Sequence, residues 1–272
     1  MTSTEPTSTK ESSTGVSSLL SIFKVIAHKK AILLRRYPVN TTSMLVPLTI
    51  FFLLVFYGGQ AVAGPALTDS LDGIIVGFFL FTLAATAFTE LSWEIMQEAQ
   101  WGTLERLYMS PYGFGTVMIL KSIVGVLVSF LMGAGILLIM TLITGRWLTF
   151  DPLTVVPLVI VTLLAALGIG FAFSGMALVF KRIENAFPLV QFAMVGLVAA
   201  PVGSTEWLRI LPISHGSYLL RQAMSEGVRL WEFPLWELGL LVVTNLVYVA
   251  IGYACLHYAV IKARNDGLMG HY

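Results

Sequence analysis

Charge and cysteine are both scarce in this sequence. Only 11% of its 272 residues are charged, against roughly 25% in soluble globular domains, while 57% are hydrophobic. A soluble core of that size would need a charged shell that the chain lacks, so we expect the bilayer to be its main solvent. The net charge of +1 indicates no nucleic-acid partner. The single cysteine, Cys255, lies in an apolar run; it excludes an internal disulfide, and we interpret it as a small hydrophobic residue.

The motifs of nucleotide binding and of catalysis are also missing. No Gly-Lys dipeptide occurs, so the chain cannot form a G-x-x-x-x-G-K-[ST] phosphate loop and cannot bind ATP in that way by itself. We find no nucleophile motif and no cluster of metal ligands, which makes an intramembrane enzyme a weak hypothesis. We therefore expect no catalytic, cofactor-binding or metal-binding residues in this chain.

The N-terminal region divides into two parts. Residues 1–18 are rich in Ser, Thr and Glu, which favours a disordered tail. From Leu19 to Tyr37 apolar residues recur at helical spacing, with basic residues largely on the other side. This pattern predicts an amphipathic helix over residues 19–40 that lies on an anionic membrane surface; a helix packed on a soluble partner is the alternative.

Six apolar segments follow, and the fold that we predict is an all-α polytopic domain over residues 41–268. The segments cover residues 43–63, 71–93, 116–143, 153–180, 186–202 and 235–261, of which the fifth is short for a hydrocarbon core. With both termini inside, twelve Lys and Arg fall on the inner side and four on the outer side, which predicts cytoplasmic termini in a cell membrane.

Small residues recur at every fourth position in two of these segments. They are Gly125, Ser129 and Gly133 in the third, and Ala166, Gly170 and Ser174 in the fourth. Small faces let helices approach closely within lipid, so we expect helix packing there; lining of a substrate path is the alternative.

Three glutamates, Glu90, Glu94 and Glu98, share one helix face where the second segment leaves the membrane. Like charges at this spacing repel, so the glutamates need solvent, protons or cationic partners. The absence of nearby His or Cys disfavours a metal site. A polar helix end that meets a partner protein or water, and a proton relay through membrane-depth acids, both remain open.

The stretch that follows predicts a short helix parallel to the membrane. Gly102 permits a sharp change of backbone direction, and Thr103 is a plausible N-cap. Leu104, Leu107 and Tyr108 would form an apolar face, and Pro111 would end the helix after Ser110. Such an element can press into a groove on a soluble partner.

Glu98, the run Gly102-Thr103-Leu104-Glu105-Arg106-Leu107 and the pair Ser110-Pro111 resemble the signature of ABC type-2 exporter permeases. Leu211-Pro212-Ile213-Ser214 with Tyr218 and Arg221 resembles that family's pattern before the last span, and Lys262-Ala263-Arg264 through Gly267 resembles its basic end. The resemblance covers roughly residues 20–268.

This resemblance implies a dimeric permease subunit without its own nucleotide site, whose separate ATPase subunit binds ATP and Mg and drives export by alternating access. It implies short extracellular re-entrant helices before the last span, and a coupling helix that docks on the ATPase. The docking surface would then comprise Glu98, Trp101, Gly102, Thr103, Leu104, Glu105, Arg106, Leu107, Tyr108, Ser110 and Pro111. The rival function is an ion- or proton-coupled secondary transporter that uses Glu90 or Glu94.

On the outer side, Arg209 and Arg221 have acids close by in the sequence. We expect these arginines to pair with acids such as Glu206 and Glu226 rather than to bind a ligand.

Overall fold

The computed structural model describes residues 10–63, 68–101, 109, 112–180 and 183–265. Every regular element within these ranges is helical, as predicted. The long helices are α1 (Lys10–Arg36), α2 (Pro38–Ala63), α3 (Thr68–Gln100), α5 (Phe114–Thr144), α6 (Pro152–Phe180), α7 (Phe187–Ala199) and α9 (Leu235–Asn265). Short helices lie between them: η2 (Glu184–Ala186), η3 (Glu206–Ile210), α8 (Ser214–Arg221), η4 (Gln222–Glu226) and η5 (Leu230–Glu232).

Helix boundaries follow from local chemistry. Gly145, with φ 69°, adopts the left-handed conformation at the end of α5 and donates its N–H to the carbonyl of Thr141. At the start of α6, Asp151 accepts hydrogen bonds from the backbone N–H of Leu153 and the hydroxyl of Thr154, and Pro152 occupies the first helical position. These signals end α5 and start α6 within a few residues of each other, so the connection between the two helices is short.

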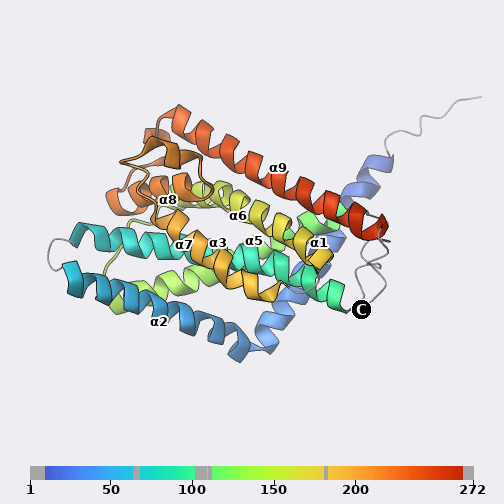
Figure 1. Ribbon diagram of the computed structural model, residues 1–272, viewed down its shortest axis with the longest axis horizontal. Coiled ribbons are helices and arrows are strands. Elements are labelled where there is room, and N and C mark those ends of the chain that lie inside the picture. The colour runs from blue at the N-terminus through green and yellow to red at the C-terminus, as the bar shows by residue number, and fades with distance from the viewer. Residues whose placement is uncertain (1–9, 64–67, 102–108, 110–111, 181–182, 266–272) are drawn as a thin grey trace, which may run out of the picture.

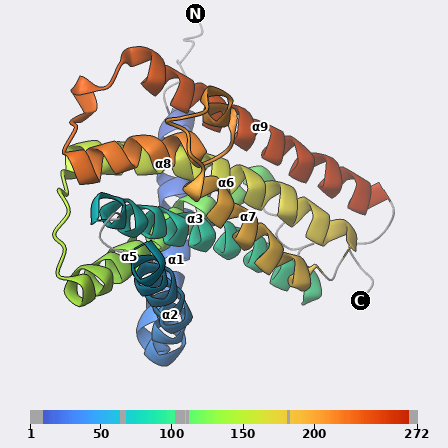
Figure 2. The same ribbon diagram turned by 60° about the vertical axis from the view of Figure 1, so that its left-hand side comes forward.

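Helix α3 lies at the centre of the bundle, between α5 and α6 (Figures 1 and 2). Both faces of small residues point toward it. A side chain at Gly133 would overlap Leu83 of α3, and Gly170 packs against Leu91 and accepts a hydrogen bond on its carbonyl from Ser92. The predicted use of these faces in helix packing is therefore confirmed.

Helices α6 and α9 pack against each other and run side by side along much of their length (Figure 2). A Cβ atom added to Gly252 of α9 would lie 1.9 Å from the carbonyl oxygen of Gly168 in α6. This contact brings two backbones together, so only glycine fits at Gly252.

Four helices are long and apolar enough to cross a membrane, counted over the described residues. They are Leu71–Glu98, Phe114–Thr144, Pro152–Phe180 and Leu235–Ala263, and shorter apolar helical stretches cover Leu45–Ala61 and Glu184–Ala199. Helix α7 ends at Ala199, three residues before the predicted end of the fifth segment, because Pro201 keeps Ala200 extended. Six membrane crossings remain a prediction.

Helix α1 begins at Lys10, so residues 10–18, expected as part of a disordered tail, are helical here. Once the apolar face from Leu19 onward forms a helix, each added residue gains a backbone hydrogen bond without a new nucleation cost. The helix ends at Arg36, and Tyr37 separates it from α2, which starts within the predicted stretch 19–40.

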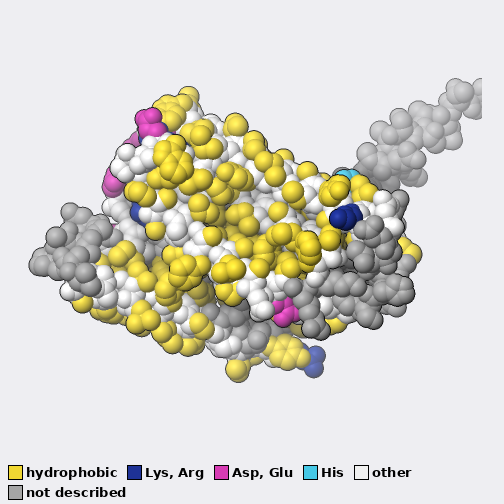
Figure 3. Space-filling view, viewed as in Figure 1, with side chains coloured by type: hydrophobic (Ala, Val, Ile, Leu, Met, Phe, Trp, Pro, Cys, Tyr) yellow, Lys and Arg dark blue, Asp and Glu magenta, His cyan; other side chains and the backbone are white. Residues whose placement is uncertain are grey.

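The arrangement of surface side chains agrees with a bilayer environment. Hydrophobic side chains cover most of the face in Figure 3, and charged ones lie near its margins. The C-terminal ends of α3 and α9 lie at one end of the bundle, and α8 lies at the other end (Figure 1).

Candidate functional site at the charged end of helix α3

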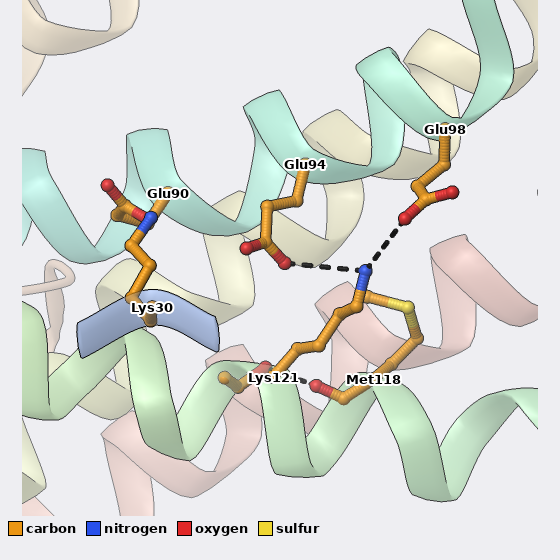
Figure 4. Close-up of polar contacts among 7 residues, drawn as sticks. Lys30, Glu90, Glu94, Glu98, Met118 and Lys121 are labelled. Atoms are coloured by element: carbon orange, nitrogen blue, oxygen red, sulfur yellow. Dashed lines mark hydrogen bonds and ion pairs between the residues drawn. The ribbon is translucent and has the colours of Figure 1, made fainter. Parts of the chain in front are cut away.

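Helix α3, with 33 residues, is longer than a crossing of a bilayer core requires. The stretch from Leu71 to Glu90 covers roughly 30 Å at the ordinary helical rise, about the thickness of a bilayer core. A crossing that begins at Leu71 would place Glu90 near the edge of the core, and Glu94 and Glu98 follow one and two turns beyond Glu90. All three side chains point to the side of α3 that faces α1 and α5 (Figure 4).

Lys121 of α5 pairs with two of these glutamates. Its Nζ lies 3.4 Å from an Oε of Glu94 and donates a hydrogen bond of 3.3 Å to an Oε of Glu98 (Figure 4). The lysine side chain is only 12% exposed, whereas Glu94 is 33% exposed. One partly buried ammonium thus offsets the repulsion between two carboxylates a helical turn apart.

Lys30 of α1 donates a hydrogen bond to Glu90 and forms an ion pair with it (Figure 4). The two residues are 60 positions apart in the sequence. This pair attaches the N-terminal helix to the centre of the bundle. The glutamates therefore have the cationic partners that their spacing required.

Two further hydrogen bonds link α3 to the region around α7. Gln100 donates to Glu184 of η2 at 3.0 Å, and Gln191 of α7 donates to the hydroxyl of Thr89 at 3.1 Å. Together with the lysine pairs, these contacts connect the last three turns of α3 to α1, α5 and α7. We name Lys30, Glu90, Glu94, Glu98 and Lys121 the charge cluster.

The predicted coupling helix follows this end of α3. Residues Gly102 to Tyr108, Ser110 and Pro111 lie outside the described residues, so the fold of that helix stays a prediction. The flanking Trp101 and Met109 are each 68% exposed. Gly113, with φ 77°, precedes α5, and a residue other than glycine would be strained there.

The lysines of the cluster were not predicted as site residues. Lys121 carried a usable signal, since an ammonium group inside an otherwise apolar segment requires a partner. Lys30 carried none, because its contact depends on the direction in which α1 crosses the bundle. No group of three or more His, Cys, Asp or Glu side chains in the described ranges is placed to hold a metal ion.

A model of the ABC-2 family of transporter proteins matches residues 60–254, from the end of α2 to within α9. The chain belongs to the ABC-2 transporter family. No curated protein and no solved structure matches it. The family resemblance inferred from the sequence is therefore confirmed.

As an ABC-2 permease, the chain is a multi-pass membrane protein of a transport system, and permeases of this family generally pair with ATPase subunits. The match includes the glutamates, Lys121 and the segment between α3 and α5. It begins after α1, so Lys30 ties a helix outside the matched region to one inside it.

Proposed function

We propose that this chain is the permease subunit of an ATP-driven exporter, which works as a dimer with a separate ATPase subunit. The observation that carries the proposal is the family match over residues 60–254, because it includes the segment 102–111 whose sequence resembles a coupling helix. The chain lacks a phosphate loop, so ATP and Mg would bind to the ATPase subunit.

The charge cluster would transmit the movement of the coupling segment. That segment connects α3 directly to α5, and Lys121 joins the same two helices by side-chain contacts. A push on residues 102–111 would move the ends of α3 and α5 together, and the Lys30–Glu90 pair would carry α1 along. Alternating access by rigid movement of such packed units is the mechanism that we propose.

Docking can be tested with two leucines of the coupling segment. Leu104 and Leu107 would each contribute about 1.5–3 kcal/mol when buried on the ATPase. Changing both to Asp should lower the affinity for the ATPase by on the order of a hundredfold or more. The measurement is a pull-down of the co-expressed ATPase with the tagged permease.

Arg106→Ala is the matched control, because an exposed ion pair is worth roughly 0–1 kcal/mol. It should reduce capture of the ATPase only slightly. Capture of the ATPase by the double Asp variant at the wild-type level would show that the segment does not dock.

A proton-coupled secondary transporter is the second candidate, since acids near membrane depth often relay protons. The lysine partners of Glu90 and Glu94 speak against it, because they relieve the repulsion without protonation. Under our proposal, collapsing the proton gradient leaves ATP-driven transport largely intact. Transport that stops with the gradient while ATP stays high, and that loses this dependence in Glu90→Gln, would favour the secondary transporter.

A further inference from the structure

A cavity of about 260 Å³ lies at the end of α3 opposite the charge cluster. Its walls come from α2, α3 and α7, and a single residue of α8 contributes the one charge among its lining residues. The apolar walls include Phe51 and Val55 of α2, Phe78 and Phe81 of α3, and Val195 of α7. The charged residue is Arg221.

Within the part of the chain that the structure describes, Arg221 does not pair with an acid, contrary to the expectation that Glu226 would be its partner. Its Nη2 donates a hydrogen bond of 2.7 Å to the carbonyl oxygen of Val198, and its Nε is buried without a hydrogen-bond partner in the described part of the chain. No ion pair to Arg221 is formed among the described residues. Arg209, by contrast, pairs with Glu237.

The hydrogen bond to Val198 uses only part of the donor capacity of the Arg221 guanidinium group. Val198 is near the end of α7, where carbonyl groups lack helical partners, and Ser217 donates to the same oxygen at 2.7 Å. Arginine has five N–H donors in a planar fork and stays charged. A partly buried charge without a counter-charge among the described residues is unfavourable, so the cavity is complementary to an anion.

Two glycines of α3 keep the space beside Arg221 open, because they carry no side chains. A Cβ atom at Gly77 would lie 3.5 Å from Nη2, and one at Gly73 would lie 3.8 Å from Cδ of Arg221. The cavity therefore combines one cation, next to these glycines, with phenylalanine and valine side chains in its walls. Val55 on its wall is exposed, so the cavity reaches the surface at α2.

We infer that this cavity binds an amphiphile with an anionic head, such as a phosphate monoester, with the head on Arg221 and the alkyl chain against Phe51, Phe78 and Val195. Its volume is just below the usual range of ligand pockets, which suits a head and the first part of a chain, with the remainder along the open side. The inference concerns binding and does not depend on the proposed ATPase coupling.

The test is equilibrium binding of radiolabelled dodecyl phosphate, below its micelle concentration, to the full chain in nanodiscs of zwitterionic lipid. Unlabelled dodecyl phosphate should displace the label, whereas dodecylphosphocholine and inorganic phosphate should displace it at least tenfold less effectively. Arg221→Gln should weaken binding by about tenfold to a hundredfold through loss of a charged hydrogen bond. Gly77→Val should weaken it by filling the cavity without removing the cation.

Arg229→Gln is the matched control, because Arg229 carries the same charge over the ring of Trp231 and does not line the cavity. It should bind dodecyl phosphate like the wild type. If Arg221→Gln fails to fold, Arg221→Lys provides the test and must retain the preference for dodecyl phosphate over dodecylphosphocholine.

Equal displacement by the two amphiphiles, unchanged binding in Arg221→Gln, or full displacement by inorganic phosphate would each overturn the inference. Absence of binding to the wild-type chain would also overturn it.

Discussion

Lys121 offers the sharpest test of the charge cluster. Lys121→Met removes the ammonium and keeps an unbranched apolar stem of similar length. Glu94 and Glu98 would then face each other across one helical turn without the ammonium group of Lys121 between them. We expect the variant to be less stable than the wild type. We also expect it to lose more stability than any other single lysine variant on the same side of the molecule.

The size of the effect follows from the geometry. Hydrogen bonds to charged groups contribute about 1.5–3 kcal/mol when buried, but exposed ion pairs contribute only about 0–1 kcal/mol. The bond to Glu98 lies between these limits, and the contact with Glu94, which is 33% exposed, lies near the lower one. Loss of the ammonium that offsets the repulsion between the two carboxylates adds about 0.2–0.5 kcal/mol. The expected loss is therefore about 1–3 kcal/mol.

The assay is thermal unfolding of the purified chain in detergent, followed by tryptophan fluorescence. A loss of this size should lower the unfolding midpoint by several degrees. Lys29→Met is the control, because Lys29 is exposed on α1, and it should melt near the wild type. Adding Glu94→Gln and Glu98→Gln to Lys121→Met should recover much of the stability. A Lys121→Met variant as stable as the wild type, or one that the Gln substitutions do not rescue, would refute the role that we give to the cluster.

Two further predictions concern topology and packing. In a Cys255→Ala background, a cysteine at Asn265 should resist an impermeant thiol reagent in intact cells, whereas one at Asp69 should react, as the distribution of Lys and Arg predicts. Reaction at position 265 would contradict the predicted cytoplasmic C-terminus. Gly252→Ala should lower the unfolding midpoint, because the new methyl group meets the α6 backbone at a cost of about 1–3 kcal/mol. Gly239→Ala on the same helix has nothing within 4 Å of the new methyl group and should leave the midpoint unchanged or raise it. Equal unfolding midpoints of the two variants would contradict the close contact between α6 and α9.

Much of the fold could be predicted because its signals are local. Apolar runs marked the long helices, and small residues such as Gly133 and Gly170 marked the faces that contact α3. The spacing of the glutamates predicted a need for cations. These properties depend on residues within one helix, where the periodicity of the sequence reports directly on which side chains share a face.

Contacts between distant segments could not be predicted in the same way. The pairing of Lys30 with Glu90 depends on the path of α1 across the bundle, and Arg209 meets Glu237 instead of the neighbouring Glu206. Arg221 lies against a helix end and two glycines because the chain before α9 turns back onto α3 and α7. A single sequence shows the charge of these residues but not the direction in which the helices bring them together.

The central claim is that this ABC-2 permease works through a separate ATPase, and affinity purification of the tagged chain from its native membranes tests it most directly. We expect an ATPase with a phosphate-loop motif to copurify, and ATP hydrolysis to occur in the complex but not in the chain stripped of that subunit. Recovery of a chain that transports substrate without any bound ATPase, or that hydrolyses ATP on its own, would contradict the claim.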